Sequence, residues 1–413
     1  AAIDLASFRD LCAGYDPATG RQLVRGTGEA HRAGWDITFS APKSVSVLWM
    51  AGNDGQRAAL ETAHRAAVDE ALRFLVDEHL VECRLGAGGY LREAPTDVIA
   101  GTFDHFTSRA GDPSIHSHCV IMNLAACADG KHRTLEPERL FDWQVVVGAA
   151  YRTALAQRLV SEGFRLRAAG RDQFEIDGID PAILETFSKR SHDIEAVVGR
   201  EASGAQKERA ALQTRGSKAE VATGAALEQL WRNELSQLGV DPWQTVRAPV
   251  TPHGIERAAD VDRDFDPPEI EGDTPVARAA SETFRHQSVG STKDLLQKSL
   301  AQAALHGTSI AAVRQEIETL AADGRLLRLD ADHWTTPGIA DAEARLLRSA
   351  DRPEAGTWFQ PEAVSQALAA NPHLSVEQQA AVVRCTDGSG ISILEAGAGP
   401  GKTTPARAVV AAA

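Results

Sequence analysis

The chain has 413 residues, of which 43% are hydrophobic and 24% are charged; these are ordinary globular values, and the length suggests roughly two to three domains. The net charge of −14 argues against a nucleic-acid binder that is basic over its whole surface, and no stretch approaches the roughly 18 apolar residues of a membrane span, so we expect no membrane insertion. Five scattered cysteines without a CxxC pair exclude a zinc finger or disulfide framework and favour the reducing cytoplasm.

Strands and long helices alternate in the first part of the chain. WDITFS at 35–40 is typical of a strand; Pro42 ends it, and Ser44 or a neighbour is expected to cap the next element. Further predicted elements are a long amphipathic helix over 54–80, a strand over 90–109, a turn at 111–113 with a second strand after it, and a long helix over 145–164.

Helices dominate the rest of the chain. The predicted elements are a short strand pair within 165–179, helices over 180–199 and 203–215, a helical connector from about 216, an acidic linker at 260–273, and a helix, strand and Gly-rich loop within 374–404. Between them, 277–350 is predicted as two helices followed by a strand, a turn and another strand. That order is winged-helix-like.

Basic residues gather after residue 150, although the total charge is negative. They form either a local nucleic-acid groove or a set of solvated helix faces. They are Arg152, Arg158, Arg165, Arg167, Arg171, Lys189, Arg190, Lys207 and Arg209.

Three histidines lie within HFTSRAGDPSIHSHCVIMN at 105–123. His116 and His118 are two positions apart, so a strand places both on the same face. His105 lies before the turn, and a hairpin register that pairs it with either of them brings all three rings together. Three imidazoles on a rigid sheet are typical of a divalent metal site with open positions. A polar strand face without a metal, and the site of a zinc hydrolase, are the alternatives.

Two segments resemble the signatures of one enzyme family. FDHFTSRAGDPSIHSHCVIMN resembles the histidine motif (HUH) of conjugative relaxases of the TrwC/TraI (MobF) family, and DITFSAPKSVSV at 36–47 resembles the family's other strong signature. AAYRTALAQRLVSEGF, the ETFSKRS run and AALQTR follow in the family's order, so the resemblance covers roughly 1–215. It implies an α/β palm, an antiparallel sheet flanked by helices.

The resemblance also implies a chemistry. His105, His116 and His118 would bind a divalent metal, Mg²⁺ or Mn²⁺ with Zn²⁺ as the alternative, and the metal would polarise a phosphate of single-stranded DNA at a plasmid transfer origin. A tyrosine would attack it and leave a 5′-phosphotyrosine link. Asp36 would support a ligand histidine or activate the tyrosine. Lys43 and Arg109 would face DNA phosphate, although Lys43 is as well explained by a cap or a solvated side chain.

The attacking tyrosine is harder to place. The family has its catalytic tyrosines near the N-terminus, before the signature that begins at Asp36. This chain has only Tyr15, Tyr90 and Tyr151, none in a doublet. Tyr15 lies in a segment that resembles the connector after the family's tyrosine region, and Tyr151 is expected in a helical core. We therefore assign no catalytic tyrosine and expect that the first strand and its tyrosines are absent from this chain.

A phosphate-binding loop is predicted near the end of the sequence. AGAGPGKT at 396–403 fits the Walker A pattern with alanine at its first position, after the predicted strand ISILEA. Its backbone would cradle phosphates, Lys402 would reach the β and γ oxygens, and Thr403 would hold Mg²⁺. LSVEQQAAV resembles the segment of RecD-like superfamily-one helicases in which a glutamine binds adenine. The predicted nucleotide-binding residues are Gly397, Gly399, Gly401, Lys402, Thr403 and Gln378.

These observations together predict a truncated conjugative relaxase–helicase. Its predicted parts are a relaxase domain over 1–215 that lacks its N-terminal strand and tyrosines, a helical connector and acidic linker over 216–276, a winged-helix-like segment over 277–350, and the start of a P-loop ATPase core over 351–413. The expected partners are single-stranded and duplex DNA and, for the parent, ATP with Mg²⁺ and conjugation machinery. This chain is expected to keep metal and DNA binding. A metal-dependent hydrolase and a non-catalytic DNA-binding module are the alternatives.

Overall fold

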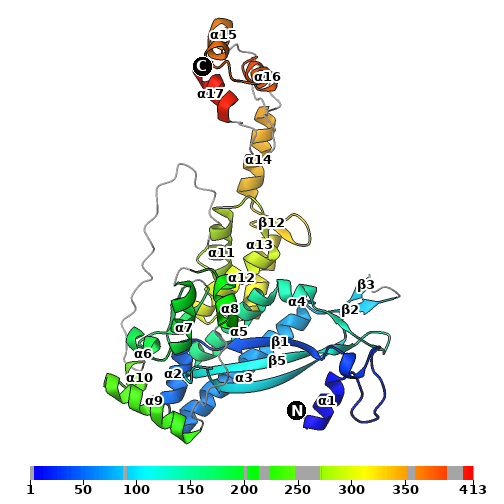
Figure 1. Ribbon diagram of the computed structural model, residues 1–413, viewed down its shortest axis with the longest axis vertical. Helices are drawn as coiled ribbons and strands as arrows, with labels where there is room; N and C mark the ends of the chain where they lie inside the picture. The colour runs from blue at the N-terminus through cyan, green and yellow to red at the C-terminus, as the bar shows by residue number, and fades with distance from the viewer. Residues whose placement is uncertain are drawn as a thin grey trace. The chain divides into compact units, whose positions relative to one another are not determined.

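The computed structural model describes residues 4–86, 91–170, 172–199, 202–213, 224–246, 270, 272–350, 359–387 and 403–412. Antiparallel sheets and helices are mixed in it, as the α/β prediction requires. The chain divides into two compact units, 1–334 and 335–413 (Figure 1). Among the described helices, we find none with the length and apolar character that crossing a bilayer requires.

The central sheet of the first unit is antiparallel and carries the histidines. Its strand order is β1 (Gly34–Ser40), β5 (Pro113–Ala126) and β4 (Asp97–Thr107), and β6 (His132–Arg133) pairs with the end of β5. Residues that pair across neighbouring strands point to the same side of a sheet. The register therefore assigns every side chain of the three long strands to one of two faces, here called the histidine face and the helix face.

Long helices cover the helix face. Ser117 of β5 contacts His64 of α3 (Asp54–Asp77), and Phe39 of β1 packs against Tyr151 of α5 (Gln144–Ser161). A capping box between Asn53 and Gln56 starts α3, which buries apolar residues at helical spacing. The predicted helices over 54–80 and 145–164 are thus confirmed.

One end of the histidine face is covered. There α1 (Leu5–Cys12) and the loop after it pack Leu11 and Val24 against Met122 and Leu124. The short helix η1 (Gly28–Ala30) follows, before β1. The histidine face is therefore a polar surface that continues from a small apolar cluster.

Smaller elements surround the palm. Pro42 is itself the N-cap of α2 (Lys43–Ala51), so the expected capping role of Ser44 is wrong: its hydroxyl accepts from the Ile176 N–H instead. The remaining pieces are the sheet β3-β2-β7 (Leu91–Glu93, Glu82–Leu85, Leu135–Glu136), α4 (Glu138–Asp142), and the predicted strand pair β8 (Leu166–Ala168) and β9 (Phe174–Ile176).

Within the described residues, five helices follow β9 before the acidic linker. They are α6 (Pro181–Thr186), α7 (Lys189–Val198), α8 (Gly204–Gln213), α9 (Ala225–Leu238) and α10 (Pro242–Thr245). The first three confirm the helices predicted over 180–199 and 203–215. Helix α9 begins inside the predicted helical connector, and its Trp231 is buried against the palm.

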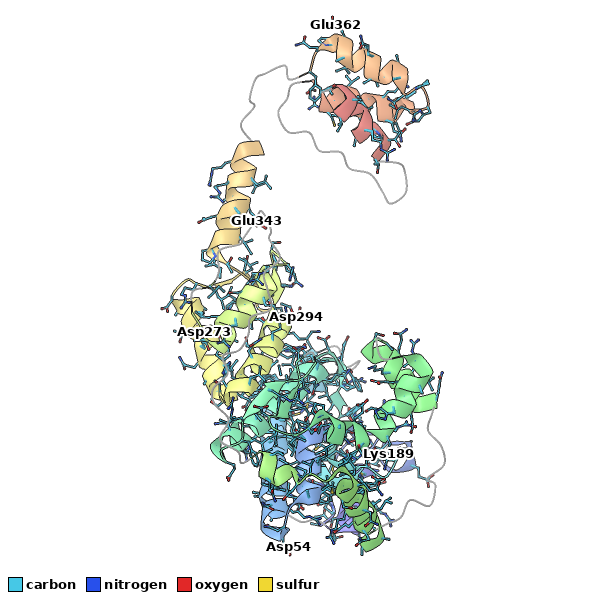
Figure 2. All side chains as sticks on the ribbon, turned by 90° about the vertical axis from the view of Figure 1, so that its left-hand side faces the viewer. Asp54, Lys189, Asp273, Asp294, Glu343 and Glu362 are labelled. Atoms are coloured by element: carbon cyan, nitrogen blue, oxygen red, sulfur yellow. The ribbon has the colours of Figure 1, made fainter. Side chains whose placement is uncertain are left out.

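The two helices and two strands predicted after the acidic linker are also present, as α12 (Thr292–His306), α13 (Ile310–Ala322), β11 (Leu327–Arg328) and β12 (His333–Thr335). The structure adds α11 (Pro275–Phe284) and β10 (Gly290–Ser291) before them, which the sequence did not predict, and the strands lie in the order β10-β12-β11. Helix α12 packs along α5, where the buried Thr153 hydroxyl donates to the carbonyl of Leu300 at 2.8 Å. Figure 2 shows this region in a second view, with Asp294 in the first turn of α12. The domain boundaries at 215, 276 and 350 stay predictions.

The second unit is helical in its described residues. It contains α14 (Pro337–Ala350), α15 (Pro361–Ala370), α16 (Val376–Cys385) and α17 (Thr403–Ala412). Leu374, Val382 and Ala408 form a small apolar cluster among the last three of these helices. The predicted strand and Gly-rich loop before α17 lie outside the described residues.

Candidate metal centre on the histidine face

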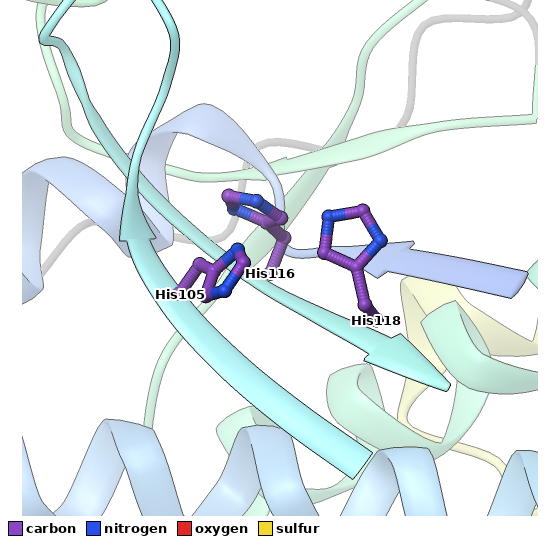
Figure 3. A group of neighbouring side chains, drawn as sticks. All are labelled: His105, His116 and His118. Carbon is purple, nitrogen blue, oxygen red and sulfur yellow. The ribbon is translucent and has the colours of Figure 1, made fainter. Parts of the chain in front are cut away.

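The hairpin of β4 and β5 brings the three predicted histidines together. His105 pairs directly with His116 in the register, and His118 lies two residues further along β5. The alternation of strand side chains then puts all three rings on the histidine face (Figure 3). The predicted clustering of His105, His116 and His118 is confirmed.

The three rings are close enough to share one ion. Their centroids are 5.2 Å apart for His105 and His116, 5.1 Å for His105 and His118, and 5.4 Å for His116 and His118. One ring nitrogen of each lies within 4.8 Å of the others. Nitrogen ligands that bind at about 2.0–2.1 Å from a common ion lie closer together than that limit, so small side-chain movements suffice.

One carboxylate and one hydroxyl of β1 orient the His118 ring. Asp36 Oδ2 lies 2.6 Å from His118 Nδ1, and Thr38 Oγ1 lies 3.1 Å from the same nitrogen. Asp36 and Thr38 face His118 because β1 pairs with β5 over this stretch. The carboxylate is an acceptor, so Nδ1 carries the proton and Nε2 keeps its lone pair for a metal.

His116 is oriented by its own strand. Its Nδ1 lies 3.0 Å from the carbonyl oxygen of Ser114, which can only accept a hydrogen bond. Nδ1 is therefore the protonated nitrogen and Nε2 is free. Burial lowers the pKa of His116, which keeps its imidazole neutral near pH 7. A neutral ring is the form that binds metal.

The donor set fits a divalent transition-metal ion. Three imidazole nitrogens on two strands would leave further coordination positions of an ion open toward solvent, because His105 is exposed and His118 is partly exposed. Imidazole ligands favour ions such as Zn²⁺ and Cu²⁺, whereas Mg²⁺ prefers oxygen. The residues present thus fit a resident metal, and they do not fix which one.

A buried polar chain lies directly behind the histidines, on the helix face. His64 of α3 contacts the Tyr151 hydroxyl through Nδ1 and the Ser117 hydroxyl through Nε2, both at 2.7 Å. Ser117 donates to Asp104 Oδ1 at 2.6 Å, and Arg65 Nε donates to Asp104 Oδ2 at 2.6 Å. Asp104 and Ser117 are direct partners in the β4–β5 register.

The turn between β4 and β5 is anchored to helices. Gly111 has a φ of 80°, which favours glycine, and its carbonyl accepts from the Trp231 indole N–H at 2.7 Å. Asp112 is buried, with the Lys189 ammonium 3.8 Å away. Lys43 donates to the Pro113 carbonyl at 3.1 Å, so this ammonium has a partner inside the protein. Arg109 is exposed in the same turn.

Most of the basic residues noted after residue 150 have internal partners. Arg158 pairs with Glu70, Lys189 with Glu234, and Lys207 with Glu195. Arg152 is partly buried and donates to the carbonyl of Asp172. These residues therefore act within the fold, and the expectation of a groove lined by the whole set gains no support.

The sequence matches a known family over this part of the chain. The family described as TrwC relaxase matches residues 1–238, more than half of the chain. This chain belongs to the TrwC relaxase family. The multifunctional conjugation protein TraI of Escherichia coli is 34% identical over 222 residues, which are 51% of this chain and 12% of the relative. The same protein of strain K12 is 33% identical over 222 residues, which are again 51% of this chain and 12% of the relative. The chain thus spans about an eighth of the length of these curated relatives.

Solved structures of a TrwC relaxase share the fold. One in complex with oriT DNA in a metal-bound state is 32% identical, covers 58% of this chain and 84% of its own, and has a TM-score of 0.52. A copper-bound complex with oriT DNA gives the same identity and TM-score. A complex with a 27-mer DNA that comprises the recognition hairpin and the cleavage site is 31% identical, covers 59% and 88%, and has a TM-score of 0.51. The predicted relaxase palm is confirmed.

Two of the three tyrosines of this TrwC-family chain lie in the described residues. Tyr151 is buried on the helix face, where burial raises the pKa of its hydroxyl well above the ordinary value. Tyr15 pairs through an isolated bridge with Gln22 in the loop after α1. Tyr90 lies outside the described residues. The expectation that Tyr151 belongs to a core is confirmed.

The predicted nucleotide site is described only at its margins. Gly397, Gly399, Gly401 and Lys402 lie outside the described residues. Thr403 is the first residue of α17, and Gln378 forms a capping box with Ser375 at the start of α16. The capping box gives the Gln378 side chain a structural role, and adenine binding stays a prediction.

Five residues behind or beside the metal centre were not predicted from the sequence: Thr38, His64, Arg65, Asp104 and Ser117. Alternation along DHFTSRAGDPSIHSH at 104–118 places Ser117 and Asp104 opposite the histidines, so that signal was available. Thr38 follows from the same rule once β1 is paired with β5. His64 lies in an alanine-rich helix, and nothing in its local sequence distinguishes it from an ordinary core residue.

Proposed function

We propose that this chain is the metal-binding and DNA-binding part of a conjugative relaxase, a protein that breaks one strand of plasmid DNA at a transfer origin. The observation that carries the proposal is the cluster of His105, His116 and His118 on an open sheet face, with Asp36 hydrogen-bonded to His118. Family membership and the DNA complexes of its TrwC relatives support the substrate.

The three histidines would hold a divalent ion, Mg²⁺ or Mn²⁺ as the resemblance suggests or a transition-metal ion as the imidazole donors favour. When bound, the ion supplies a Lewis acid that neutralises charge on the scissile phosphate. The side chains of β1 orient the His118 ring, and its Nε2 lone pair points away from Asp36. A copper-bound and a metal-bound TrwC structure support a metal at this site, with its identity open.

We infer that the bond-breaking step is a transesterification. A tyrosine oxygen bonds to phosphorus while the bond from phosphorus to the 3′ oxygen breaks, and the proton that the tyrosine loses balances the proton that the 3′ oxygen gains. The product is a 5′-phosphotyrosine link and a free 3′ hydroxyl. Asp36 is engaged with His118, which favours a supporting role over direct activation of the tyrosine.

DNA phosphate contacts are proposed for Arg109 and Lys43, and the support for Arg109 is stronger. Arg109 is exposed in the turn between β4 and β5 and is suited to a phosphate. Lys43 already donates to the Pro113 carbonyl, and burial lowers its pKa. Lys43 is therefore the weaker candidate. In this proposal the protein acts in the cytoplasm on single-stranded and duplex DNA, together with conjugation machinery.

A second proposed activity concerns the C-terminal part. We propose that AGAGPGKT at 396–403 binds ATP with Mg²⁺ in an ATP-dependent helicase that unwinds the DNA behind the relaxase. The support is the sequence pattern and the position of Thr403 at the first turn of α17, where a phosphate loop meets its helix. Trinitrophenyl-ATP fluorescence with Lys402→Ala and the exposed control Arg407→Ala tests it. Equal binding by both variants would contradict it.

The two alternative functions make different use of the same chain. A hydrolase would use the three histidines and bound water and leave no protein–DNA link. A DNA-binding module would use the winged-helix-like segment. Arg314 of α13, however, contacts Glu78 at 2.6 Å and lies over the Phe74 ring at the end of α3. Because this helix is engaged with the palm, the second alternative is disfavoured.

The test uses the full-length protein encoded by the gene and single-stranded DNA that carries the transfer origin of its replicon. The DNA is labelled at its 3′ end, incubated with Mn²⁺, and run on a denaturing gel. His116→Ala and a chelator are the two negative controls. The exposed His286→Ala is the matched histidine control.

The proposal expects a labelled protein–DNA adduct that requires Mn²⁺ and is lost in His116→Ala. Metal-dependent DNA breakage without an adduct would contradict the relaxase proposal and support a hydrolase. DNA binding without breakage, unchanged by the chelator and by His116→Ala, would contradict the relaxase proposal and support a non-catalytic DNA-binding module.

A further inference from the structure

The histidine face and the helix face of the hairpin are directly connected. Asp104 precedes His105, and Ser117 lies between His116 and His118, so two residues of the helix face adjoin all three candidate ligands. The side chains of Asp104 and Ser117 are hydrogen-bonded to each other at 2.6 Å. Whatever fixes this pair also fixes the backbone from which the histidines project.

The protons of this buried chain can be assigned from its donors and acceptors. The Asp104 carboxylate is the acceptor at one end, because the Arg65 guanidinium and the Ser117 hydroxyl both donate to it at 2.6 Å. The Ser117 hydroxyl donates its only proton to Asp104, so it must accept a hydrogen bond from His64 Nε2. Burial lowers the pKa of His64 to about 4, so its ring is neutral. Nδ1 then accepts from the Tyr151 hydroxyl.

The result is a one-directional series of hydrogen bonds. It runs from Tyr151 of α5 through His64 of α3 to Ser117 of β5 and Asp104 of β4, and Arg65 of α3 closes its far end. His64 is 1% exposed and Ser117 is fully buried. A fully satisfied buried polar network rigidifies the elements that it joins, and an unsatisfied one is costly. This network joins both ligand strands to both long helices.

We propose that Tyr151, His64, Ser117, Asp104 and Arg65 are positioning residues that set the geometry of the three-histidine site from behind the sheet. The inference rests on the proposed function, since it assumes that the histidines bind a metal. Residues that orient metal ligands typically change metal affinity by roughly 10- to 100-fold when they are replaced. Here the orientation acts through the strand backbone, because Ser117 and Asp104 hold the register that places His105 beside His116.

The experiment compares Ser117→Ala with Ser44→Ala in the full-length protein. Both serines are fully buried, and both hydroxyls hold a neighbouring group: Ser117 accepts from His64, and Ser44 accepts from the Ile176 N–H at 2.8 Å. The probes are Mn²⁺ affinity by calorimetry and the electron paramagnetic resonance spectrum of bound Cu²⁺. Tyr151→Phe and His64→Gln are milder variants in case Ser117→Ala does not fold. Phe removes only the far link, and Gln keeps a donor for Ser117.

The proposal expects Ser117→Ala to lower Mn²⁺ affinity by roughly 10-fold or more and to change the Cu²⁺ spectrum, with smaller changes in the same direction for His64→Gln. Ser44→Ala should keep the wild-type affinity and spectrum even where it loses as much thermal stability. Unchanged metal binding in Ser117→Ala and His64→Gln, or equal changes in Ser44→Ala, would overturn it. Failure of the wild-type protein to bind metal would overturn the proposed function first, and this inference with it.

Discussion

At the scale of single residues, the metal centre depends on which nitrogen of each imidazole carries a proton. Asp36 and the Ser114 carbonyl accept from the Nδ1 atoms of His118 and His116, and both Nε2 lone pairs are thereby left for a metal. The neutral state of His116 follows from its burial. Two of the three candidate ligands are thus oriented by a close neighbour: Ser114 two residues away holds His116, and Asp36 on the adjacent strand holds His118.

The first prediction concerns Asp36. Asp36→Asn removes the negative charge beside His118 Nδ1 and should lower Mn²⁺ affinity by roughly 10-fold or more, because a carboxylate partner makes the ligand nitrogen more basic. Calorimetric titration measures the effect, with the exposed Asp193→Asn as the control. Equal affinities for wild type and Asp36→Asn would show that the contact does not support the ligand.

The second prediction concerns pH. Burial lowers the pKa of His64 to about 4, whereas the unfolded chain titrates near 6.5, so only the unfolded chain binds this proton between those values. Asp104 faces the ring and opposes the shift, while His116 and Arg65 lower the pKa further. The stability from neutral His64 is complete above about pH 6.5 and is lost as the pH falls toward 4, by roughly 2 to 3 kcal/mol.

Urea denaturation of the chelated protein at pH 7.5, 6.0 and 5.0 measures this effect. His64→Gln lacks the titrating ring, so its unfolding free energy should fall less between pH 7.5 and 5.0 than that of the wild type. If the unfolding free energies of the two proteins fall equally with pH, His64 is not the source of the pH dependence.

At the scale of elements, strand alternation made most of the site predictable. His116 and His118 had to share a face, and the turn at Gly111 brought His105 back beside them. The long helices followed from their apolar spacing. Ser44 failed as a predicted cap because tertiary contact with Ile176 takes its hydroxyl. His64 was not predictable, because its role depends on packing between α3 and β5, which no local pattern encodes.

The third prediction belongs to the β4–β5 turn. Trp231→Phe keeps an aromatic ring but leaves the Gly111 carbonyl without the indole N–H, at a cost of roughly 1–3 kcal/mol. Since this turn ends both ligand strands, we also expect weaker Mn²⁺ binding. Trp243→Phe is the matched control, because its indole N–H donates to Leu48 at 2.8 Å, away from the hairpin. Denaturation and calorimetry compare the two variants. Similar Mn²⁺ affinities in Trp231→Phe and Trp243→Phe would show that the turn does not influence metal binding.

At the scale of the whole molecule, the family match and the packing divide the chain differently. The TrwC match ends at 238, whereas the first compact unit extends to 334. The reason is α12, which packs along α5 and covers its buried Thr153. The sequence indicated the helices after the acidic linker but gave no sign that they would dock on the palm.

The fourth prediction tests this docking. Leu300 of α12 is fully buried, and Leu300→Ala should lower the unfolding free energy by about 2–5 kcal/mol. If residues up to 334 unfold as one unit, the fluorescence transition of the palm should move to lower denaturant with the rest. The exposed Leu5→Ala is the control. A separate early transition that leaves the palm unchanged would show that the two parts fold independently.

The most direct test of the account is metal content. The wild-type protein is dialysed against Mn²⁺, Zn²⁺ or Cu²⁺, and the bound ion per chain is measured by mass spectrometry. His105→Ala, His116→Ala and His118→Ala are compared with the exposed His286→Ala. The account predicts a single bound ion in the wild type and in His286→Ala, and a sharp loss in each of the other three. Equal metal content in all five proteins would contradict it.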